Sequence, residues 1–249
     1  MEQPPSPEMK SVELGESMES LLRFTLRSHL DEQVPSFDLD LTRDFCIHLL
    51  EEDTDSTEKP AVYKLLSRAL SECLTSEEQG LSVDKSSHFE KYSKLFHDLG
   101  HDLENMLKKV NFELHVQEPY FKQLKDGLKT VEGRCAVGDY MRISSGAFIL
   151  FNKCLLLEVQ EVHHYTSFSE MLSVEGLAKV LPGVESIEEG VRVYRNFYPE
   201  EKERRNGVVA ILVAKPADQP YAALAGALSE LKSTGIKSLL EDYTARVTL

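Results

Sequence analysis

The pattern of apolar residues changes near Asn111, and this change limits what the chain can fold into. Before it, apolar residues recur at helical spacing. After it, short runs such as residues 112–116 alternate between apolar and polar, as strands do. Helical patterns also interrupt and follow these strands. The sequence therefore predicts an α+β protein, with a helical N-terminal region before a smaller mixed domain.

The first part of the chain is expected to form a small helical bundle. Its helices are predicted at about 18–26, 41–50, 61–74 and 87–110, with polar links between them. The first residues are rich in Pro, Ser and Glu, which is typical of a disordered leader. The predicted domains are a leader over 1–12, an acidic helical domain over 13–110, a mixed domain over 111–216, and a C-terminal helix and tail over 217–249.

The second part is expected to form a small β-barrel with flanking helices. Strands are predicted at 112–116, 130–136, 140–143, 148–151, 154–162 and 207–213. Helices are predicted at 120–126, 169–180, 187–197 and 221–240. Pro119 suits a helix start and Gly127 a helix end. The pair Asn152 and Lys153 predicts a tight turn.

The net charge of −14 is unevenly distributed. Residues 1–110 hold 12 Lys and Arg against 23 Asp and Glu, a net of −11, and the remainder holds 16 against 19, a net of −3. The second part can therefore still carry a local basic surface. No apolar run approaches the length of about 18 residues that a membrane span needs. The 4 scattered cysteines suggest reduced thiols and a cytoplasmic or nuclear protein.

Three charged residues, Lys129, Glu132 and Arg134, stand in and just before a strand that otherwise has the composition of a core. Strand alternation places Glu132 and Arg134 on one face, about 6.6 Å apart, with Lys129 at the preceding turn. Two cations keep a carboxylate ionised and leave donors for a phosphate or the polar edge of a base. The alternative is an ordinary ion-pair network on a strand edge.

The order of these residues resembles the ASCH domain family. The pattern Gly-x-Lys-x-x-Glu-x-Arg matches Gly127, Lys129, Glu132 and Arg134, and the segments EPYFKQL, VGDYMRI and NGVVAILV are also similar. The resemblance covers about residues 111–214, and we recognise no family in the first 110 residues. It implies a PUA-like β-barrel that binds RNA in a cleft between barrel and helices, with a role in RNA processing or transcription coactivation.

The resemblance further implies that Lys129, Glu132 and Arg134 line this cleft, beside Gly127. We expect Tyr194, Arg195 and Tyr198 to border it, because aromatic rings next to arginines suit the stacking of unpaired bases. Packing between a helix and its neighbours is the alternative explanation for these residues. The expected partner is RNA or a modified nucleotide, and no cofactor, metal or membrane is expected.

A second hypothesis is an enzyme. Some small bacterial proteins similar to this family are amidohydrolases of acetylated cytidine, which use a lysine, a threonine three residues later and a separate glutamate. Lys129 fits this pattern, but Glu132 stands at the threonine position and the nearest threonine is Thr130. A carboxylate cannot take the nucleophilic role of a threonine hydroxyl without changing the chemistry, so the hydrolase ranks second. Candidates for the separate glutamate are Glu170, Glu175 and Glu185.

A third hypothesis is a protein-interaction adaptor that binds its partner through the N-terminal helices. Its distinguishing feature would be an exposed apolar groove between those helices. Within them, His97 and His101 lie one helical turn apart, a spacing that can hold a metal. No third ligand is recognisable nearby, so we interpret these two histidines as part of a polar helix face.

Overall fold

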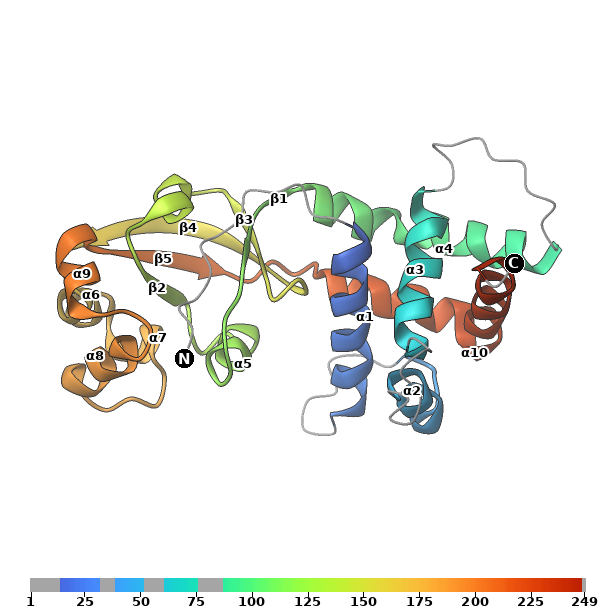
Figure 1. Ribbon diagram of the computed structural model, residues 1–249, viewed down its shortest axis with the longest axis horizontal. Coiled ribbons are helices and arrows are strands. Elements are labelled where there is room, and N and C mark those ends of the chain that lie inside the picture. Colours follow the sequence, from blue (N-terminus) through green and yellow to red (C-terminus); the bar gives the residue numbers. More distant parts are fainter. Residues whose placement is uncertain (1–13, 32–38, 52–60, 76–86, 248–249) are drawn as a thin grey trace. The chain divides into compact units, whose positions relative to one another are not determined.

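The computed structural model describes residues 14–31, 39–51, 61–75 and 87–247 (Figure 1). The chain forms two compact units, which we call the mixed unit, Lys109–Ala217, and the helical unit, Val12–Lys108 with Asp218–Leu249. The leader predicted over 1–12 lies outside the described residues. None of the described helices is both long enough and apolar enough to cross a membrane.

The helical unit confirms the helical character predicted for the N-terminal region. Its helices are α1 (Leu14–Leu30), α2 (Arg43–Leu50), α3 (Val62–Thr75), α4 (Ser87–Lys108) and α10 (Pro220–Val247). Each of α1, α3 and α4 packs against α10. The core consists of apolar side chains that recur at helical spacing, such as Leu22 and Leu26 of α1 and Leu66 and Leu70 of α3.

The mixed unit is built on one five-stranded sheet. Its strands are β1 (Val110–Leu114), β2 (Val131–Cys135), β3 (Phe148–Phe151), β4 (Leu155–Tyr165) and β5 (Val208–Ala214). Their order is β1-β3-β4-β5-β2, with β1 parallel to β3 and every other pair antiparallel. The α+β class is therefore confirmed. The sheet has two edges, β1 and β2, and the described strands do not close into the expected barrel.

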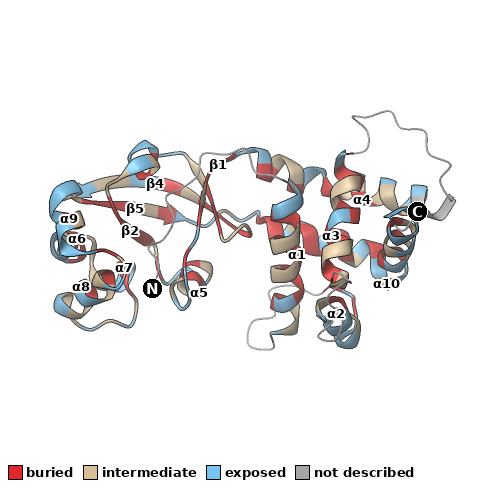
Figure 2. Ribbon diagram, in the orientation of Figure 1, coloured by how far each residue is buried: buried red, intermediate tan, exposed pale blue. Residues whose placement is uncertain are grey.

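A side chain connects the two edges where a closed barrel would have backbone pairs. Arg134 of β2 donates from Nη2 to the carbonyl oxygen of His115, which directly follows β1, at 2.8 Å. Although β2 is an edge strand, all five of its residues are buried (Figure 2). The chain around β2 therefore covers an edge that would otherwise expose unpaired backbone groups.

The remaining elements of the mixed unit are α5 (Tyr120–Lys125), η2 (Gly138–Arg142), α6 (Phe168–Glu175), α7 (Leu177–Val180), α8 (Ile187–Arg195) and α9 (Glu200–Asn206). The strand predicted at 140–143 is wrong, because this segment is the 3₁₀ helix η2. Tyr140 and Ile143 are buried while Met141 and Arg142 are exposed, a three-residue spacing that suits a helical turn.

One other prediction for this unit was wrong in detail. The helix predicted at 169–180 is divided into α6 and α7, because Gly176 adopts a φ of 90° and interrupts the helical backbone. The segment between the helix predicted at 187–197 and the strand predicted at 207–213 forms α9. The turn at Asn152 and Lys153 is confirmed, since both residues have the positive φ that a tight hairpin requires.

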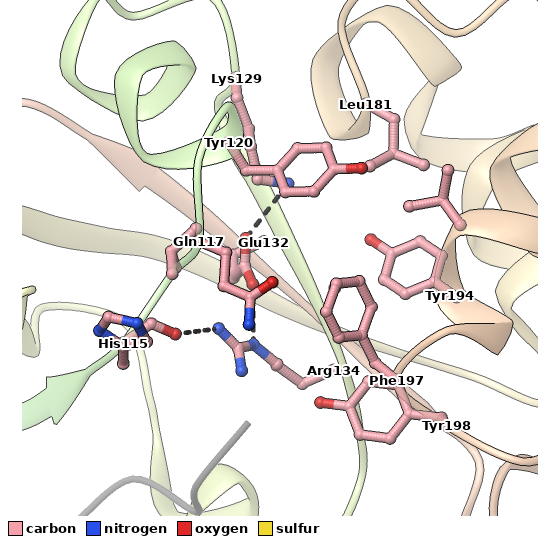
Figure 3. Close-up of a pocket in the computed structure, with 13 residues that line it drawn as sticks. His115, Gln117, Tyr120, Lys129, Glu132, Arg134, Leu181, Tyr194, Phe197 and Tyr198 are labelled. Atoms are coloured by element: carbon pink, nitrogen blue, oxygen red, sulfur yellow. Dashed lines mark hydrogen bonds and ion pairs between the residues drawn. The ribbon is translucent and has the colours of Figure 1, made fainter. Parts of the chain in front are cut away.

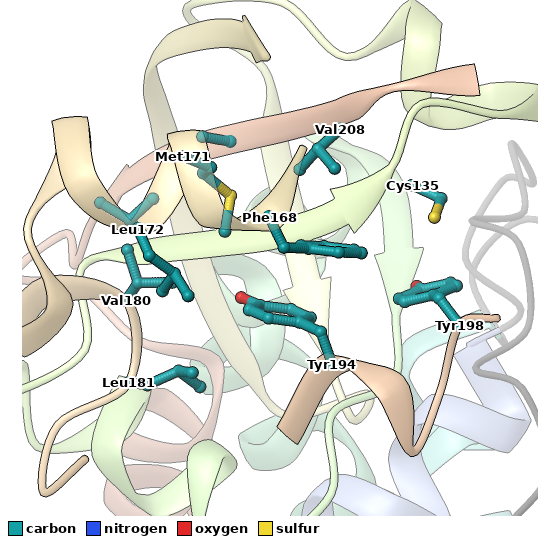
Figure 4. Packing of buried hydrophobic residues seen from close by; sticks show 11 residues of the cluster. Cys135, Phe168, Met171, Leu172, Val180, Leu181, Tyr194, Tyr198 and Val208 are labelled. Atoms are coloured by element: carbon teal, nitrogen blue, oxygen red, sulfur yellow. The ribbon is translucent and has the colours of Figure 1, made fainter. Parts of the chain in front are cut away.

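Helices α6 and α8 pack on one face of the sheet at β2 and β5. Val131 and Cys135 of β2 belong to this core together with Phe168 of α6 and Tyr194 of α8, and the last three are labelled in Figure 4. The rings of Phe168 and Tyr194 are stacked with centroids 4.0 Å apart. All four cysteines of the chain are buried and none forms a disulfide. This packing fixes α8 beside the buried edge strand.

Candidate functional site

A cavity of about 240 Å³ lies in the mixed unit where the two sheet edges approach α8. Four segments form its walls: the link from β1 into α5, the turn before β2 with β2 itself, Leu181 after α7, and α8 with the residues that follow it (Figure 3). Lys129, Glu132 and Arg134 line this cavity together with Tyr194 and Tyr198. Five of the residues singled out in the sequence are thus brought to one place.

Glu132 lies between the two cations of the motif. One carboxylate oxygen, Oε2, is 3.1 Å from Lys129 Nζ, and the other, Oε1, accepts from Arg134 Nε at 2.7 Å. The three residues are only 3%, 6% and 4% exposed, in sequence order. Burial alone would raise the pKa of Glu132, but the two neighbouring cations lower it below its ordinary value. The carboxylate is therefore held ionised and can only accept hydrogen bonds.

All of the N–H donors of the Lys129 ammonium are used by partners within the protein. Its ammonium donates to the carbonyl oxygens of Val131 at 2.8 Å and Val180 at 2.5 Å, in addition to Glu132. An ammonium group has three N–H donors. Burial lowers the pKa of Lys129 below its ordinary value. Lys129 therefore supports Glu132 and the turn before β2, and it has no N–H left for a ligand.

Arg134, in contrast, keeps part of its hydrogen-bond donor capacity for a ligand. Besides Glu132 and the carbonyl of His115, its guanidinium donates from Nη1 to the hydroxyl of Tyr140 at 3.2 Å. The Tyr198 hydroxyl is a further partner of this guanidinium, and because a guanidinium carries five N–H groups, at least one remains beyond these contacts. Each oxygen of Glu132 likewise keeps lone pairs beyond the single bond that it accepts. These two side chains provide donors and acceptors at the cavity.

Aromatic side chains form much of the remaining wall, with Tyr120 on one side and Tyr194, Phe197 and Tyr198 on the other (Figure 3). Tyr198 is 3% exposed, and its hydroxyl has no hydrogen-bond partner of good geometry among the described residues. It lies near Arg134, which can only donate. The hydroxyl proton of Tyr198 therefore has no acceptor at the cavity.

Gly133 is required by the close approach of α6 and α8 to β2. A Cβ at this position would lie 2.4 Å from the Tyr194 hydroxyl oxygen and 2.6 Å from Met171 Cε. We expect Gly133→Ala to lower the free energy of unfolding by about 1–3 kcal/mol, because Tyr194 and Met171 must both move. Urea denaturation followed by circular dichroism measures this change.

The matched control is Gly226→Ala. A Cβ on this helical glycine of α10 would meet no atom within 4 Å, so the substitution should be neutral or stabilising. A loss at Gly226 equal to that at Gly133 would contradict the packing argument.

The other residues singled out in the sequence do not line the cavity. Gly127 follows α5 with a φ of 73°, and Thr130 donates its backbone N–H to the carbonyl of Lys179. Arg195 forms an ion pair with the buried carboxylate of Glu203, whose other oxygen accepts the backbone N–H of Phe168 at 2.6 Å. Arg195 is therefore an anchor between α8 and α9.

The three glutamates considered for a hydrolase also lie elsewhere. Glu170 accepts from Thr166, and Glu175 accepts from the Tyr165 hydroxyl and contacts His163. Neither they nor Glu185 line the cavity, where Glu132 is the one carboxylate among the described residues. No group of three His, Cys, Asp or Glu side chains within the described ranges is placed to hold a metal ion.

The sequence reasoning missed His115, Gln117, Tyr120 and Phe197 as lining residues. His115 and Gln117 belong to the link between β1 and α5, Tyr120 is the first residue of α5, and the position of all three depends on the meeting of the two sheet edges. Phe197 had a local signal, because it precedes Tyr198 directly in the segment already expected to border the cleft.

Comparison with known proteins shows which family the mixed unit resembles. Residues 114–217 match the ASCH domain. A solved structure of the hypothetical protein PH0355 is 46% identical, covering 42% of this chain and 97% of that one, with a TM-score of 0.41. Protein PF0455 from Pyrococcus furiosus is 44% identical, covering 43% and 97% with a TM-score of 0.39. No curated protein matches. Through residues 114–217, this chain belongs to the ASCH domain family.

Proposed function

We propose that the ASCH domain binds single-stranded RNA, or a modified nucleotide, by taking one base into the cavity between β2 and α8. The observation that supports this most directly is the pairing of aromatic walls with a buried, ionised carboxylate and a guanidinium that both have unused hydrogen-bonding capacity. Unpaired bases are recognised in this way, by stacking on aromatic rings and by hydrogen bonds to their edges. Such binding suits a role in RNA processing or transcription coactivation.

The size of the cavity favours a single base. Its volume of about 240 Å³ is smaller than the roughly 300–1,000 Å³ of pockets that hold drug-sized ligands. A paired base in a duplex cannot turn into such a cavity without unpairing, whereas a base in a single strand is already accessible. The expected ligand is therefore a free nucleotide or one unpaired position of an RNA strand.

The net charge of the mixed unit does not favour sequence-independent electrostatic binding to the RNA backbone. Residues 109–217 hold 14 Lys and Arg against 15 Asp and Glu, a net charge of −1. Binding of single strands through Z phosphates gives a salt slope of about −0.7Z. Because contacts to the base dominate the proposed binding, we expect a shallow dependence on salt. The logarithm of the affinity should fall against the logarithm of the salt concentration with a slope of about −1 between 50 and 200 mM salt.

Phe197→Ala in the full-length chain tests the proposal. Loss of one aromatic stacking surface costs about 1–3 kcal/mol per base, so the affinity for a short single-stranded RNA should fall about tenfold or more. Fluorescence anisotropy with a labelled RNA pool of random sequence measures the affinity. Thermal melting verifies that the variant is folded.

The matched control is Phe148→Ala. Phe148 at the start of β3 is half-buried like Phe197 but does not line the cavity. Its variant should keep the affinity of the natural chain within about twofold, a change below 0.5 kcal/mol. Equal losses in both variants, or RNA affinity untouched by Phe197→Ala, would count against a base in this cavity.

The two other hypotheses gain no support from the described residues. No Ser, Thr or Cys lines the cavity, so an amidohydrolase with a hydroxyl nucleophile at Thr130 finds no counterpart there. The adaptor hypothesis for the helical unit stays a prediction. Capture of a protein partner by the helical unit would be independent of the cavity and compatible with the function proposed here.

A further inference from the structure

The unused hydrogen-bonding groups at the cavity form a definite pattern. Glu132 is ionised and offers acceptors only, Arg134 offers N–H donors only, and the Tyr198 hydroxyl has a proton without an acceptor. Lys129 adds nothing to the pattern, because its three donors are already used.

These groups follow one another along one side of the cavity. Arg134 donates a hydrogen bond from Nε to Glu132, and the Tyr198 hydroxyl points toward the Arg134 side chain and interacts with its guanidinium (Figure 3). The site therefore presents an acceptor, then a donor, then a second donor. A complementary ligand presents a donor, an acceptor and a second acceptor in that order.

Resting on the RNA-binding function proposed above, we propose that the cavity selects a base with an exocyclic amino group next to a ring-nitrogen acceptor. Cytosine matches all three positions, with its amino group at Glu132, its ring nitrogen at Arg134 and its carbonyl oxygen at Tyr198. Adenine matches the first two positions and offers only a C–H at the third.

Other bases place the wrong group against at least one side chain. Uracil and hypoxanthine turn a carbonyl oxygen toward the carboxylate of Glu132 and an N–H toward the donors of Arg134 when they occupy the same position. At its Watson–Crick edge, guanine with its amino group at Glu132 turns a ring N–H toward Arg134, which also donates. Because Glu132 and Arg134 are held in place by their buried partners, neither can exchange its role to suit these bases.

The test uses the full-length chain and four labelled RNA pentamers, U-U-X-U-U, with X as cytosine, adenine, uracil or inosine. A good pair of hydrogen bonds discriminates between bases by an amount that corresponds to about tenfold in affinity. We expect the cytosine and adenine pentamers to bind at least about tenfold more tightly than their uracil and inosine counterparts. Each comparison changes only the hydrogen-bonding edge, since the members of each pair have nearly the same shape.

Tyr198→Phe provides a second, independent readout. It removes one hydroxyl from a ring that otherwise keeps its position, and should weaken the cytosine pentamer about fivefold. The adenine pentamer should stay within about twofold, because adenine makes no hydrogen bond at that position. Equal weakening of both pentamers would overturn the assignment of Tyr198.

The outcomes separate this inference from the function on which it rests. Equal affinity for all four pentamers, lost in Phe197→Ala, would overturn the base preference and leave the cavity as an RNA site. Tighter binding of uracil or inosine would also overturn it. Absence of binding to every pentamer would overturn the RNA-binding function and the preference together.

Discussion

Glu132→Leu is expected to lower the free energy of unfolding of the ASCH domain by about 3–5 kcal/mol. The substitution leaves the ammonium of Lys129 and the guanidinium of Arg134 buried without their shared counter-ion. Hydrogen exchange of β2 and β5 amides in increasing urea measures the effect within this unit. The matched control is Glu161→Leu on β4, whose carboxylate is exposed and whose loss should cost less than about 1 kcal/mol.

A double variant distinguishes a lost ion pair from a generally disturbed core. Lys129→Met with Glu132→Leu removes one buried cation along with the carboxylate. The combined loss should be smaller than the sum of the two single losses by about 1–3 kcal/mol, because the residues contact each other. Strictly additive losses would contradict the coupled network.

Lowering the pH should cause part of the loss of stability that is expected for Glu132→Leu. The pKa of Glu132 is lower in the folded protein than in the unfolded chain, where a glutamate titrates near about 4.3. Its contribution to stability is therefore fully present above that pH and is lost as the pH falls through the folded value. Unfolding measured from pH 7 down to pH 3 should show a steeper loss for the natural chain than for Glu132→Leu. Parallel curves would contradict a lowered pKa.

Glu203→Ala should have the second largest effect, a loss of about 2–3 kcal/mol in the free energy of unfolding. It removes the partner of Arg195 and the acceptor of the Phe168 backbone N–H. The value is below that of a fully buried pair, because the Arg195 side chain is 30% exposed and water can partly replace its partner. Urea denaturation followed by circular dichroism measures the loss.

The same variant should also weaken RNA binding, because Phe168 stacks on Tyr194 at the cavity wall. Glu200→Ala is the control, since Glu200 is an exposed residue of the same helix. It should change neither stability nor affinity by more than about 0.5 kcal/mol. A Glu203→Ala variant as stable as this control would contradict the anchoring role.

The local part of the site was accessible from the sequence. Strand alternation placed Glu132 and Arg134 on one face, and the structure joins them directly at 2.7 Å. The saturation of Lys129 was not predictable, because one of its acceptors is the carbonyl of Val180, 51 residues later in the chain. No local pattern reports such a contact.

The same limit applies to the fold. The α+β class follows from the periods of apolar residues, which are local. The open sheet depends on the order of its strands, which places β1 and β2 at opposite edges although they follow one another along the chain. Residues 140–143, at the end of η2, were predicted as a strand because four residues with two buried positions fit either a strand or a helical turn.

The position of Arg134 affects how natural or random variants of this protein should be interpreted. The guanidinium that faces the cavity is also the group that connects the two edges of the sheet through His115. In a genetic screen, loss of Arg134 would lower the amount of folded protein and the affinity for ligand at once, and the two defects would be inseparable. Variants at Phe197 or Tyr198 that keep normal protein levels would report on the ligand alone.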